Sequence, residues 1–553
     1  MIISRRGFTT GALSAALGSQ LSMPAFAQSR PDLAGALAAI RAHGEAHLAR
    51  YRLPGMTLGL TTADGFSTVM NFGFANADAR TPITGDTLFQ IGSITKVMTA
   101  AVLHQFASEG RFSLTDRISS LMPTLTLPAG NAVQVQHLID HVAGLPGDAP
   151  MFPDGGLWAA YAPGAHWHYS NTGYTILGKL AEQFGGKPLA RLFAERIFAP
   201  LGMRRSRGAI IGDDRELYAQ GYEGVDQIQP YVIGQPLAPA AWVDVTFGAG
   251  SVASTADDMN RFLRSLANAA QGRGGLGLSP AAAKPFTTHA VTSDTPGMTY
   301  GNGLMHVGYA GRSYLHHTGG MPSFSSAFHI DVASGAGAFA SCNLGAFADY
   351  RPRLLSRFAV DALTNALGGK PLPGAPLLET PLAGPGAYIG RYSGPGGSFE
   401  LRAGAPLTIV ADGREAQLQY VGGNLFRTLH PSFRRFSLMI EKRGAVVTGA
   451  SWGPNAYLHA GGGGTLAPSD PALAKFTGRY ISDNPWWAGM GTVVERGGKL
   501  WIGTETPMTP IGNNLWRVGE QAWSPERASF ADLVDGRPQT LIFSGEKFAR
   551  HDI

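Results

Sequence analysis

The sequence predicts a multidomain protein in which an α/β domain is followed by two small antiparallel β-barrels. Strand-like patterns flank a run of helical patterns between residues 28 and 366, so strands from both ends of this domain should share one sheet. A segment rich in proline and glycine, 367–387, is typical of a linker. Beyond it, short strand patterns alternate with turns, and part of the sequence repeats.

The α/β domain begins with an amphipathic helix pattern over residues 31–52, which Pro54-Gly55 should end. A hairpin is expected next, with strands at 56–60 and 67–72. Further helices are expected over 173–184, 255–268 and 352–366, and further strands over 299–309, 313–318, 324–331 and 336–342.

The repeat consists of two motifs that recur at nearly one offset. Tyr388-Ile389-Gly390-Arg391-Tyr392 returns 88 positions later as Phe476-Thr477-Gly478-Arg479-Tyr480, and Asn424-Leu425-Phe426-Arg427 returns 90 positions later as Asn514-Leu515-Trp516-Arg517. We therefore expect two barrel domains, 388–464 and 470–553; one larger barrel made from both copies is the alternative. The tryptophans of the second copy are expected in its core rather than in a ligand site: Trp486, Trp487, Trp501 and Trp516.

Residues 1–27 have the features of a twin-arginine signal peptide. Arg5-Arg6 precede a weakly apolar stretch, and Ala25-Phe26-Ala27 is a cleavage site of the A-x-A type. We expect a soluble periplasmic protein, since no later stretch offers the ~20 apolar residues of a membrane span. Removing two arginines from a net charge of +5 leaves +3, which is too little to indicate nucleic acid as a partner. Cys342 is the only cysteine, so no intrachain disulfide can form.

Ser93 and Lys96 form an S-x-x-K motif at the start of an apolar run. A glycine precedes the serine, and residues 97–103 have the composition of a buried helix. Positions i and i+3 share a helix face, so the lysine ammonium should lie beside the serine hydroxyl. A hydroxyl paired with a basic group is the arrangement of an activated nucleophile. The alternative is an exposed serine and an exposed lysine, because the motif alone is common.

Two further motifs follow in order. Tyr169-Ser170-Asn171 precedes a predicted helix, and His317-Thr318-Gly319-Gly320 ends a predicted strand. With Ser93 and Lys96, this series resembles the serine β-lactamase and penicillin-binding protein superfamily, in the branch with class C β-lactamases, family-VIII-type esterases and D-aminopeptidases. That branch has S-x-x-K, Y-x-N and then K-T-G or H-x-G. The resemblance covers about residues 31–366 and includes 137–146 and 248–252.

The resemblance implies a β-lactamase-like domain, with an antiparallel sheet flanked by helices and a helical subdomain, and lipocalin-like barrels. It also implies roles for the motif residues. Ser93 would be the nucleophile, and the backbone N–H groups of Ser93 and Gly320 would bind the oxyanion. Tyr169 would activate the deacylating water, and Asn171 would bind an amide carbonyl of the substrate. Thr318 and Gly319 belong to the same substrate-binding strand.

The sequence leaves open whether Lys96 or Tyr169 is the base. Each has a reference pKa near 10 that must fall by about 3 to act at neutral pH, and the two titrations are coupled. No cofactor and no metal is expected. His137-x-x-Asp140-His141 could pass for zinc ligands, but it lacks the glutamate of an H-E-x-x-H motif.

His317 departs from the lysine that many relatives carry in the third motif. A histidine is mostly neutral at pH 7, whereas a lysine is cationic and can hold a carboxylate. This favours esters, amides or aminopeptidase substrates over penicillins and peptides with a free carboxylate. Strand alternation should place His316 on the opposite face from His317, in a structural role.

The sequence thus predicts an exported serine hydrolase that forms an acyl-enzyme on small or short-peptide substrates. The three-part architecture resembles D-aminopeptidases, in which a barrel loop reaches the active site. A carboxylesterase or a β-lactamase on the same site is an alternative. Another is a non-catalytic protein that binds peptidoglycan fragments or a partner. A homodimer is one expected assembly, and the sequence does not fix the oligomeric state.

Overall fold

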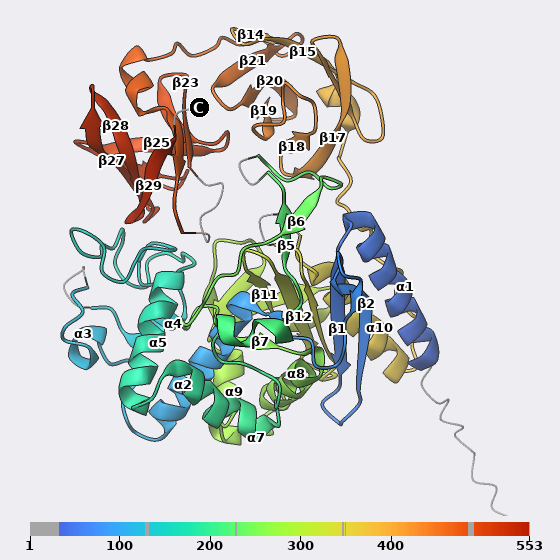
Figure 1. The fold of residues 1–553 in the computed structure, drawn as a ribbon. Helices are drawn as coiled ribbons and strands as arrows, with labels where there is room; N and C mark the ends of the chain where they lie inside the picture. Colours follow the sequence, from blue (N-terminus) through green and yellow to red (C-terminus); the bar gives the residue numbers. More distant parts are fainter. Residues whose placement is uncertain are drawn as a thin grey trace, which may run out of the picture.

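The computed structural model describes residues 33–127, 132–226, 229–345, 348, 350–484 and 491–551. The predicted signal peptide, 1–27, lies outside these residues. One α/β domain forms the lower part of the molecule in Figure 1, and two barrels lie above it. The predicted multidomain fold is confirmed.

A nine-stranded sheet with the order β3-β2-β1-β13-β12-β11-β10-β9-β8 organises the α/β domain. Its strands are β1 (Gly55–Thr61), β2 (Ser67–Asn76), β3 (Thr81–Pro82), β8 (Val291–Thr292), β9 (Met298–Gly301), β10 (Leu304–Tyr309), β11 (Arg312–Gly320), β12 (Ser325–Asp331) and β13 (Gly337–Cys342). Because β1 pairs antiparallel with β13, the two ends of the domain do share one sheet, as predicted. Two short pairs lie outside it, β4 (Phe89–Gln90) with β7 (Ala253–Ser254) and β5 (Tyr222–Gly224) with β6 (Leu237–Pro239).

The single strand predicted over 299–309 was wrong. The chain turns at Asn302 and Gly303, whose φ angles of +53° and +78° lie in the left-handed region. Asn-Gly is the favoured dipeptide for a tight hairpin because both residues tolerate positive φ. The segment therefore forms two paired strands, β9 and β10.

Helices cover both faces of this sheet. On one face α1 (Leu33–Tyr51) packs on α10 (Arg353–Leu367), which contacts β12 and β13; on the other face α8 (Ala256–Ala270) packs on β1 and β13. The other α-helices in the described part of the chain, which include the helical subdomain, are α2 (Thr95–Ser108), α3 (Ile118–Leu121), α4 (Val135–Ile139), α5 (Asn171–Gly185), α6 (Leu189–Phe193), α7 (Ala199–Leu201) and α9 (Pro280–Thr288).

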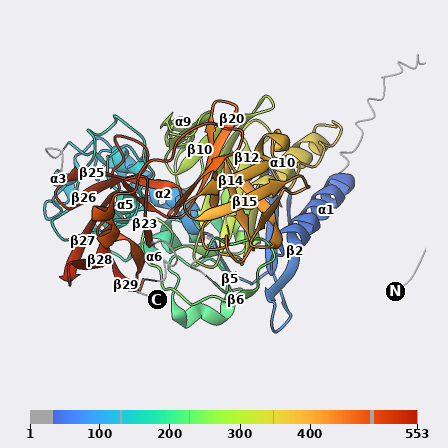
Figure 2. The same cartoon turned by 90° about the horizontal axis from the view of Figure 1, so that it is seen from above.

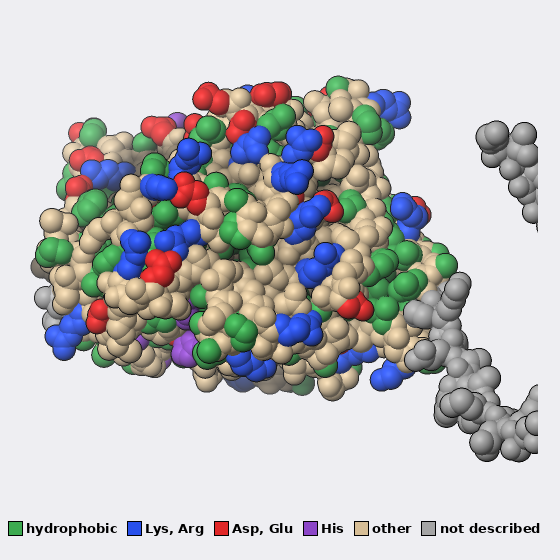
Figure 3. All heavy atoms as spheres, turned by 90° about the horizontal axis from the view of Figure 1, so that it is seen from below, with side chains coloured by type: hydrophobic (Ala, Val, Ile, Leu, Met, Phe, Trp, Pro, Cys, Tyr) green, Lys and Arg blue, Asp and Glu red, His purple; other side chains and the backbone are tan. Residues whose placement is uncertain are grey.

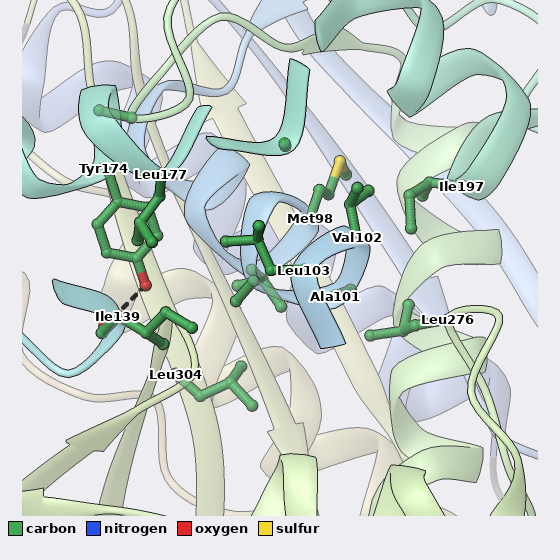
Figure 4. Close-up of a cluster of buried hydrophobic side chains, with 14 of the residues drawn as sticks. Met98, Ala101, Val102, Leu103, Ile139, Tyr174, Leu177, Ile197, Leu276 and Leu304 are labelled. Atoms are coloured by element: carbon green, nitrogen blue, oxygen red, sulfur yellow. Dashed lines mark hydrogen bonds between the residues drawn. The ribbon is translucent and has the colours of Figure 1, made fainter. Parts of the chain in front are cut away.

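Helix α2 is buried on nearly every side, as its apolar sequence predicts. Figure 4 shows Met98, Val102 and Leu103 of this helix among side chains from α5 and other elements. The hydroxyl of Tyr174 on α5 donates to the carbonyl of Ile139 at 2.9 Å. This core fixes the two helices whose first turns carry the Ser93 and Asn171 motifs.

The C-terminal region forms two separate closed barrels of eight antiparallel strands, so the single-barrel alternative was wrong. Barrel 1 comprises β14 (Gly390–Gly394), β15 (Gly397–Arg402), β16 (Thr408–Ala411), β17 (Arg414–Gly422), β18 (Leu425–Thr428), β19 (Leu438–Arg443), β20 (Val446–Trp452) and β21 (Asn455–His459). Barrel 2 comprises β22 (Gly478–Ile481), β23 (Thr492–Arg496), β24 (Lys499–Ile502), β25 (Thr506–Gly512), β26 (Leu515–Val518), β27 (Arg527–Val534), β28 (Arg537–Phe543) and β29 (Glu546–His551).

Of the barrel tryptophans, Trp516 lies in the core of barrel 2, as predicted. Trp501 is half-buried under the guanidinium of Arg496, 4.1 Å from its ring centre. Residues 486 and 487 lie outside the described residues.

The two barrels are tied together by a buried arginine. Arg496 of barrel 2 donates to the carbonyls of Gly453 in barrel 1 and Thr504 in barrel 2, at 2.6 and 2.7 Å. Thr504 in turn donates to Ser437 of barrel 1 at 2.9 Å. Figure 2, seen from above, shows barrel 2 over α2 and α5 and barrel 1 over the sheet. The barrels therefore form one layer on top of the α/β domain.

The lower face of the molecule carries basic and acidic side chains interspersed with one another (Figure 3). In the part of the chain that the structure describes, no helix is both long and apolar enough to cross a membrane.

Candidate active site

Ser93 lies in a 3₁₀ turn, Gly92–Ile94, that leads directly into α2. The turn needs glycine at position 92, because φ there is +54° and a Cβ would lie 2.8 Å from both N and O of Gly320. The end of β11 thus packs on the turn that carries the serine. This places the Gly320 backbone against Gly92, the residue before Ser93, so the expected two N–H donors for one oxyanion come from neighbouring segments.

Lys96 is completely buried and contacts three oxygen atoms. Its Nζ lies 3.1 Å from Ser93 Oγ, 2.6 Å from Asn171 Oδ1 and 2.9 Å from the carbonyl of Ala249. Burial lowers the pKa of Lys96 to about 7, although the negative charge of Asp148 acts in the opposite direction. The neutral amine is therefore far more accessible near neutral pH than in an exposed lysine.

Tyr169 is also next to the serine, with whose hydroxyl its own hydroxyl is hydrogen-bonded. Lys96 Nζ is 4.7 Å from the centre of its ring. Loss of hydration raises the pKa of Tyr169 above its usual 10, and the hydrogen bond to Ser93 only partly offsets this. The phenol keeps its proton at neutral pH, in contrast to Lys96.

Asn171 begins α5, whose first turn is capped by the side chain of Ser170. The Asn171 amide has both ends engaged, since Oδ1 accepts from Lys96 and Nδ2 donates to Asp148 Oδ1 at 2.7 Å. Asp148 was not singled out from the sequence. Its carboxylate fixes the orientation of the Asn171 amide, because only a nitrogen can donate to it.

His317 is buried against Tyr169 and Tyr300, with ring centres 6.3 and 5.9 Å away. Its Nδ1 donates to the carbonyl of Thr318 at 2.6 Å. Burial and the nearby charge of Lys96 lower the pKa of His317 to about 3, so the ring is neutral. His316 points to the opposite face and stacks on His329, at 4.4 Å between ring centres.

Barrel 2 contacts the segments next to the site through the loop between β26 and β27. Glu526 in this loop accepts from the backbone N–H of Gly147 at 2.7 Å and from His168 Nε2 at 2.8 Å. Trp523 of the same loop stacks on His166, with 4.7 Å between ring centres. Neither residue could be found from the sequence, because no motif marks them and hundreds of residues separate them from the site.

Asp140 and His141, two of the candidate zinc ligands, are hydrogen-bonded to other residues. Asp140 binds His289 Nε2 at 2.6 Å, and His141 accepts from the Ser170 backbone at 3.0 Å. Across the described ranges, no three His, Cys, Asp or Glu side chains come together in a way that could hold a metal ion.

A family model described as Beta-lactamase matches residues 25–360. The chain belongs to the beta-lactamase family. Within the family, it is 32% identical over 170 residues to a beta-lactamase of Pseudomonas fluorescens, covering 29% of this chain and 48% of that protein. It is 27% identical over 221 residues to penicillin-binding protein 4* of Bacillus subtilis, covering 35% of this chain and 48% of that one. The chain thus spans about half the length of these two curated relatives.

Solved structures agree with this family assignment. A D-amino acid amidase from Ochrobactrum anthropi SV3, complexed with L-phenylalanine amide, superposes with a TM-score of 0.52 at 26% identity, over 60% of this chain and 99% of that one. The octameric penicillin-binding protein homologue from Pyrococcus abyssi has a TM-score of 0.54 at 21% identity, over 77% of this chain and 98% of that one. The second likeness shows the fold alone.

Proposed function

We propose that this beta-lactamase family member is a serine hydrolase that forms an acyl-enzyme on amide or ester bonds, and that its substrates resemble those of D-aminopeptidases, with a free amino group next to the scissile carbonyl. The observation that carries the proposal is the buried chain of contacts from Ser93 through Lys96 and Asn171 to the carboxylate of Asp148. It supplies both an activated nucleophile and an anion near it.

The contacts of Lys96 favour it as the base. A neutral amine has two N–H donors and one lone pair. Asn171 Oδ1 and the Ala249 carbonyl can only accept, so they take the two donors. The lone pair is then directed at the Ser93 hydroxyl, 3.1 Å away. Tyr169, whose pKa is raised, would act as a donor and not as the first base.

Acylation and deacylation then follow from proton transfers among Ser93, Lys96 and Tyr169. Lys96 takes the Ser93 proton while Oγ attacks the carbonyl carbon, and the backbone N–H groups of Ser93 and Gly320 stabilise the oxyanion. When the C–N bond breaks, the leaving nitrogen receives a proton from Tyr169, which recovers one from Lys96. In deacylation, water attacks the acyl-enzyme ester while its proton passes to the Lys96–Tyr169 pair. The same pair then returns a proton to Ser93 Oγ as the ester bond breaks.

The charge of the site supports a substrate with an α-ammonium group. Burial raises the pKa of Asp148 above its usual value, although the hydrogen bond from Asn171 and the nearby Lys96 act in the opposite direction. Among the described residues, Asp148 has one hydrogen-bond partner, Asn171, so its carboxyl group retains acceptor capacity. The Asn171 amide nitrogen, which the resemblance assigns to a substrate carbonyl, already donates to Asp148. An acceptor next to the nucleophile suits a donor on the substrate, and neutral His317 offers no cation to a carboxylate. The name of the structural neighbour, a D-amino acid amidase, agrees with this preference.

The test is release of p-nitroaniline from D-alanine p-nitroanilide, compared with the L-isomer and with Ser93→Ala. Turnover of the D-isomer alone, lost in the variant, is expected. Turnover of short p-nitrophenyl esters but of neither anilide would make the protein a carboxylesterase. Failure of Ser93 to react with a fluorophosphonate probe would support the non-catalytic binding protein instead.

Export by the twin-arginine route is part of the proposal, and rests on Arg5-Arg6 and on the Ala25-Phe26-Ala27 site. Replacing both arginines with lysine should retain the protein in the cytoplasm of an expressing bacterium. Periplasmic recovery of this variant at the wild-type level would contradict the export route.

A further inference from the structure

The carboxylate of Glu526 joins barrel 2 to two segments of the α/β domain, at Gly147 and at His168. Its Oε1 accepts from the backbone N–H of Gly147 and from His168 Nε2, at 2.7 and 2.8 Å. Its Oε2 accepts from the hydroxyl of Ser544, on the loop between β28 and β29 of the same barrel. Both oxygens are therefore engaged, and the side chain is only 17% exposed.

Both residues that bind Glu526, His168 and Gly147, are directly joined to the Tyr169-Ser170-Asn171 motif, one by a peptide bond and the other by a hydrogen bond. His168 directly precedes Tyr169 in the chain. The carbonyl of Gly147 accepts from the backbone N–H groups of Asn171 and Thr172, at 2.6 and 3.1 Å. Glu526 thus holds the peptide N–H of Gly147 on one side, while the carbonyl of the same residue holds the first turn of α5 on the other. Gly147 is also next to Asp148, which orients the Asn171 amide.

Further contacts keep the barrel loop in this position. The indole N–H of Trp158 donates to the carbonyl of Pro525 at 2.7 Å, and the Arg527 guanidinium lies 5.2 Å from the Trp158 ring centre. Trp523 stacks on His166, two residues before His168. The loop between β26 and β27 therefore contacts both segments, 144–158 and 166–168, that lead to the motif.

The electrostatics of Glu526 agree with a charged, fully bonded carboxylate. Burial alone would raise its pKa, but hydrogen bonds from His168, Ser544 and the Gly147 backbone outweigh this and lower the pKa below the usual value. A buried carboxylate that loses its partners is strongly destabilised, so the two loops and the barrel hold one another in place.

From these contacts we infer that Glu526 is a positioning residue for catalysis: through Gly147 and His168 it fixes the hydroxyl of Tyr169 and the amide of Asn171 relative to Ser93. Barrel 2 then acts on the chemical step, through the position of these two side chains. This inference rests on the proposed hydrolase function for its kinetic consequence, but its structural part is independent of that function.

The experiment compares Glu526→Ala, Glu526→Gln and the control Glu495→Ala in the full chain. Glu495 is a more exposed carboxylate of barrel 2 that serves as the control, because it also accepts backbone and hydroxyl hydrogen bonds, from Gly498 at 2.8 Å and Ser469 at 2.5 Å. Those partners lie in barrel 2 and in the segment before it. Steady-state turnover, normalised by titration of reactive Ser93, and amide hydrogen exchange over residues 144–172 are measured on each.

For Glu526→Ala we expect kcat to fall about ten-fold or more with little change in KM, because positioning affects the transition state more than ground-state binding. The amides of Gly147, Asn171 and Thr172 should exchange faster. Glu526→Gln, which retains an acceptor for Gly147, should recover most of both losses, and Glu495→Ala should match the wild type.

Unchanged kcat and unchanged exchange in Glu526→Ala would overturn the inference, as would an equal loss in Glu495→Ala, which would indicate general destabilisation of the barrel. If the wild type hydrolyses no substrate, the proposed function fails, and hydrogen exchange alone then decides whether Glu526 holds the loops.

Discussion

Replacing Asp148 with asparagine should move the acid limb of the pH–rate profile to lower pH. Lys96 titrates near pH 7 in the wild type, and the charge of Asp148 raises its pKa. The amide of the new side chain keeps an oxygen that can accept from Asn171 Nδ2, so the contacts around Lys96 stay in place while the charge is lost. The lysine cation is then less stable, and the amine becomes neutral at a lower pH.

The size of this change follows from the contacts. Hydrogen bonds of 2.6 and 2.7 Å on either side of the Asn171 amide, which itself spans about 2.2 Å, place the Lys96 and Asp148 charges at most about 7.5 Å apart. At an effective dielectric constant of about 20, that separation corresponds to about 2 kcal/mol. The pKa of Lys96 should therefore fall from about 7 to about 5.5 in the variant.

The assay is hydrolysis of p-nitrophenyl acetate between pH 5 and 9, with the rate of Ser93→Ala subtracted at each pH. This ester has no group that titrates in the range, and His317 and Tyr169 keep one protonation state across it. At pH 6 the neutral fraction of Lys96 should rise from about a tenth to about three-quarters. We expect kcat/KM to rise two- to five-fold there, since a base of lower pKa is also weaker.

The same variant should bind D-alanine p-nitroanilide less well, because the partner of the substrate ammonium has lost its charge. Asp154→Asn, at an exposed carboxylate further along the same segment, is the control for a general charge effect. An acid limb that stays at pH 7 in Asp148→Asn would refute the assignment of Lys96 as the base that Asp148 influences.

Two more expectations concern Lys96 and His317. Between pH 7 and 10.5 the unfolded chain keeps the Lys96 proton that the folded protein releases, so stability should rise by about 2 kcal/mol from pH 7 to 9. Urea unfolding of Lys96→Met should lack this increase, and equal slopes would show that the lysine pKa is not lowered. His317→Lys should lower KM for substrates that carry a carboxylate, because it places a cation beside Tyr169. An unchanged KM in steady-state assays with matched carboxylate and amide substrates would contradict this.

The local spacing of apolar and polar residues was sufficient to predict most of the helices and strands. Helices α1, α8 and α10 begin and end within about two residues of expectation, because each buries one face and has polar residues on the other. The pair β9 and β10 was missed because strand-forming residues continue on both sides of Asn302-Gly303, and the turn itself was not recognised. The barrels were found from the repeat, which is independent of periodicity.

Some residues of the candidate site could be predicted from the sequence, and others could not. Ser93, Lys96, Tyr169, Asn171 and His317 stand in short motifs, and the structure brings them together. Asp148 and Glu526 have no such motif. They are single acidic residues in loops, and only the folded chain shows that each accepts a hydrogen bond next to the serine site.

The contact between Gly147 and Glu526 also has a consequence for how the protein assembles. It joins positions 379 apart in the chain, so closing it is among the most entropically costly steps of folding. Contacts of such long sequence separation form late, after local helices and hairpins. Residue 526 is also synthesised well after the serine and lysine. The loop around Gly147 therefore acquires its contact with Glu526 only when the second barrel has folded and docked on the α/β domain.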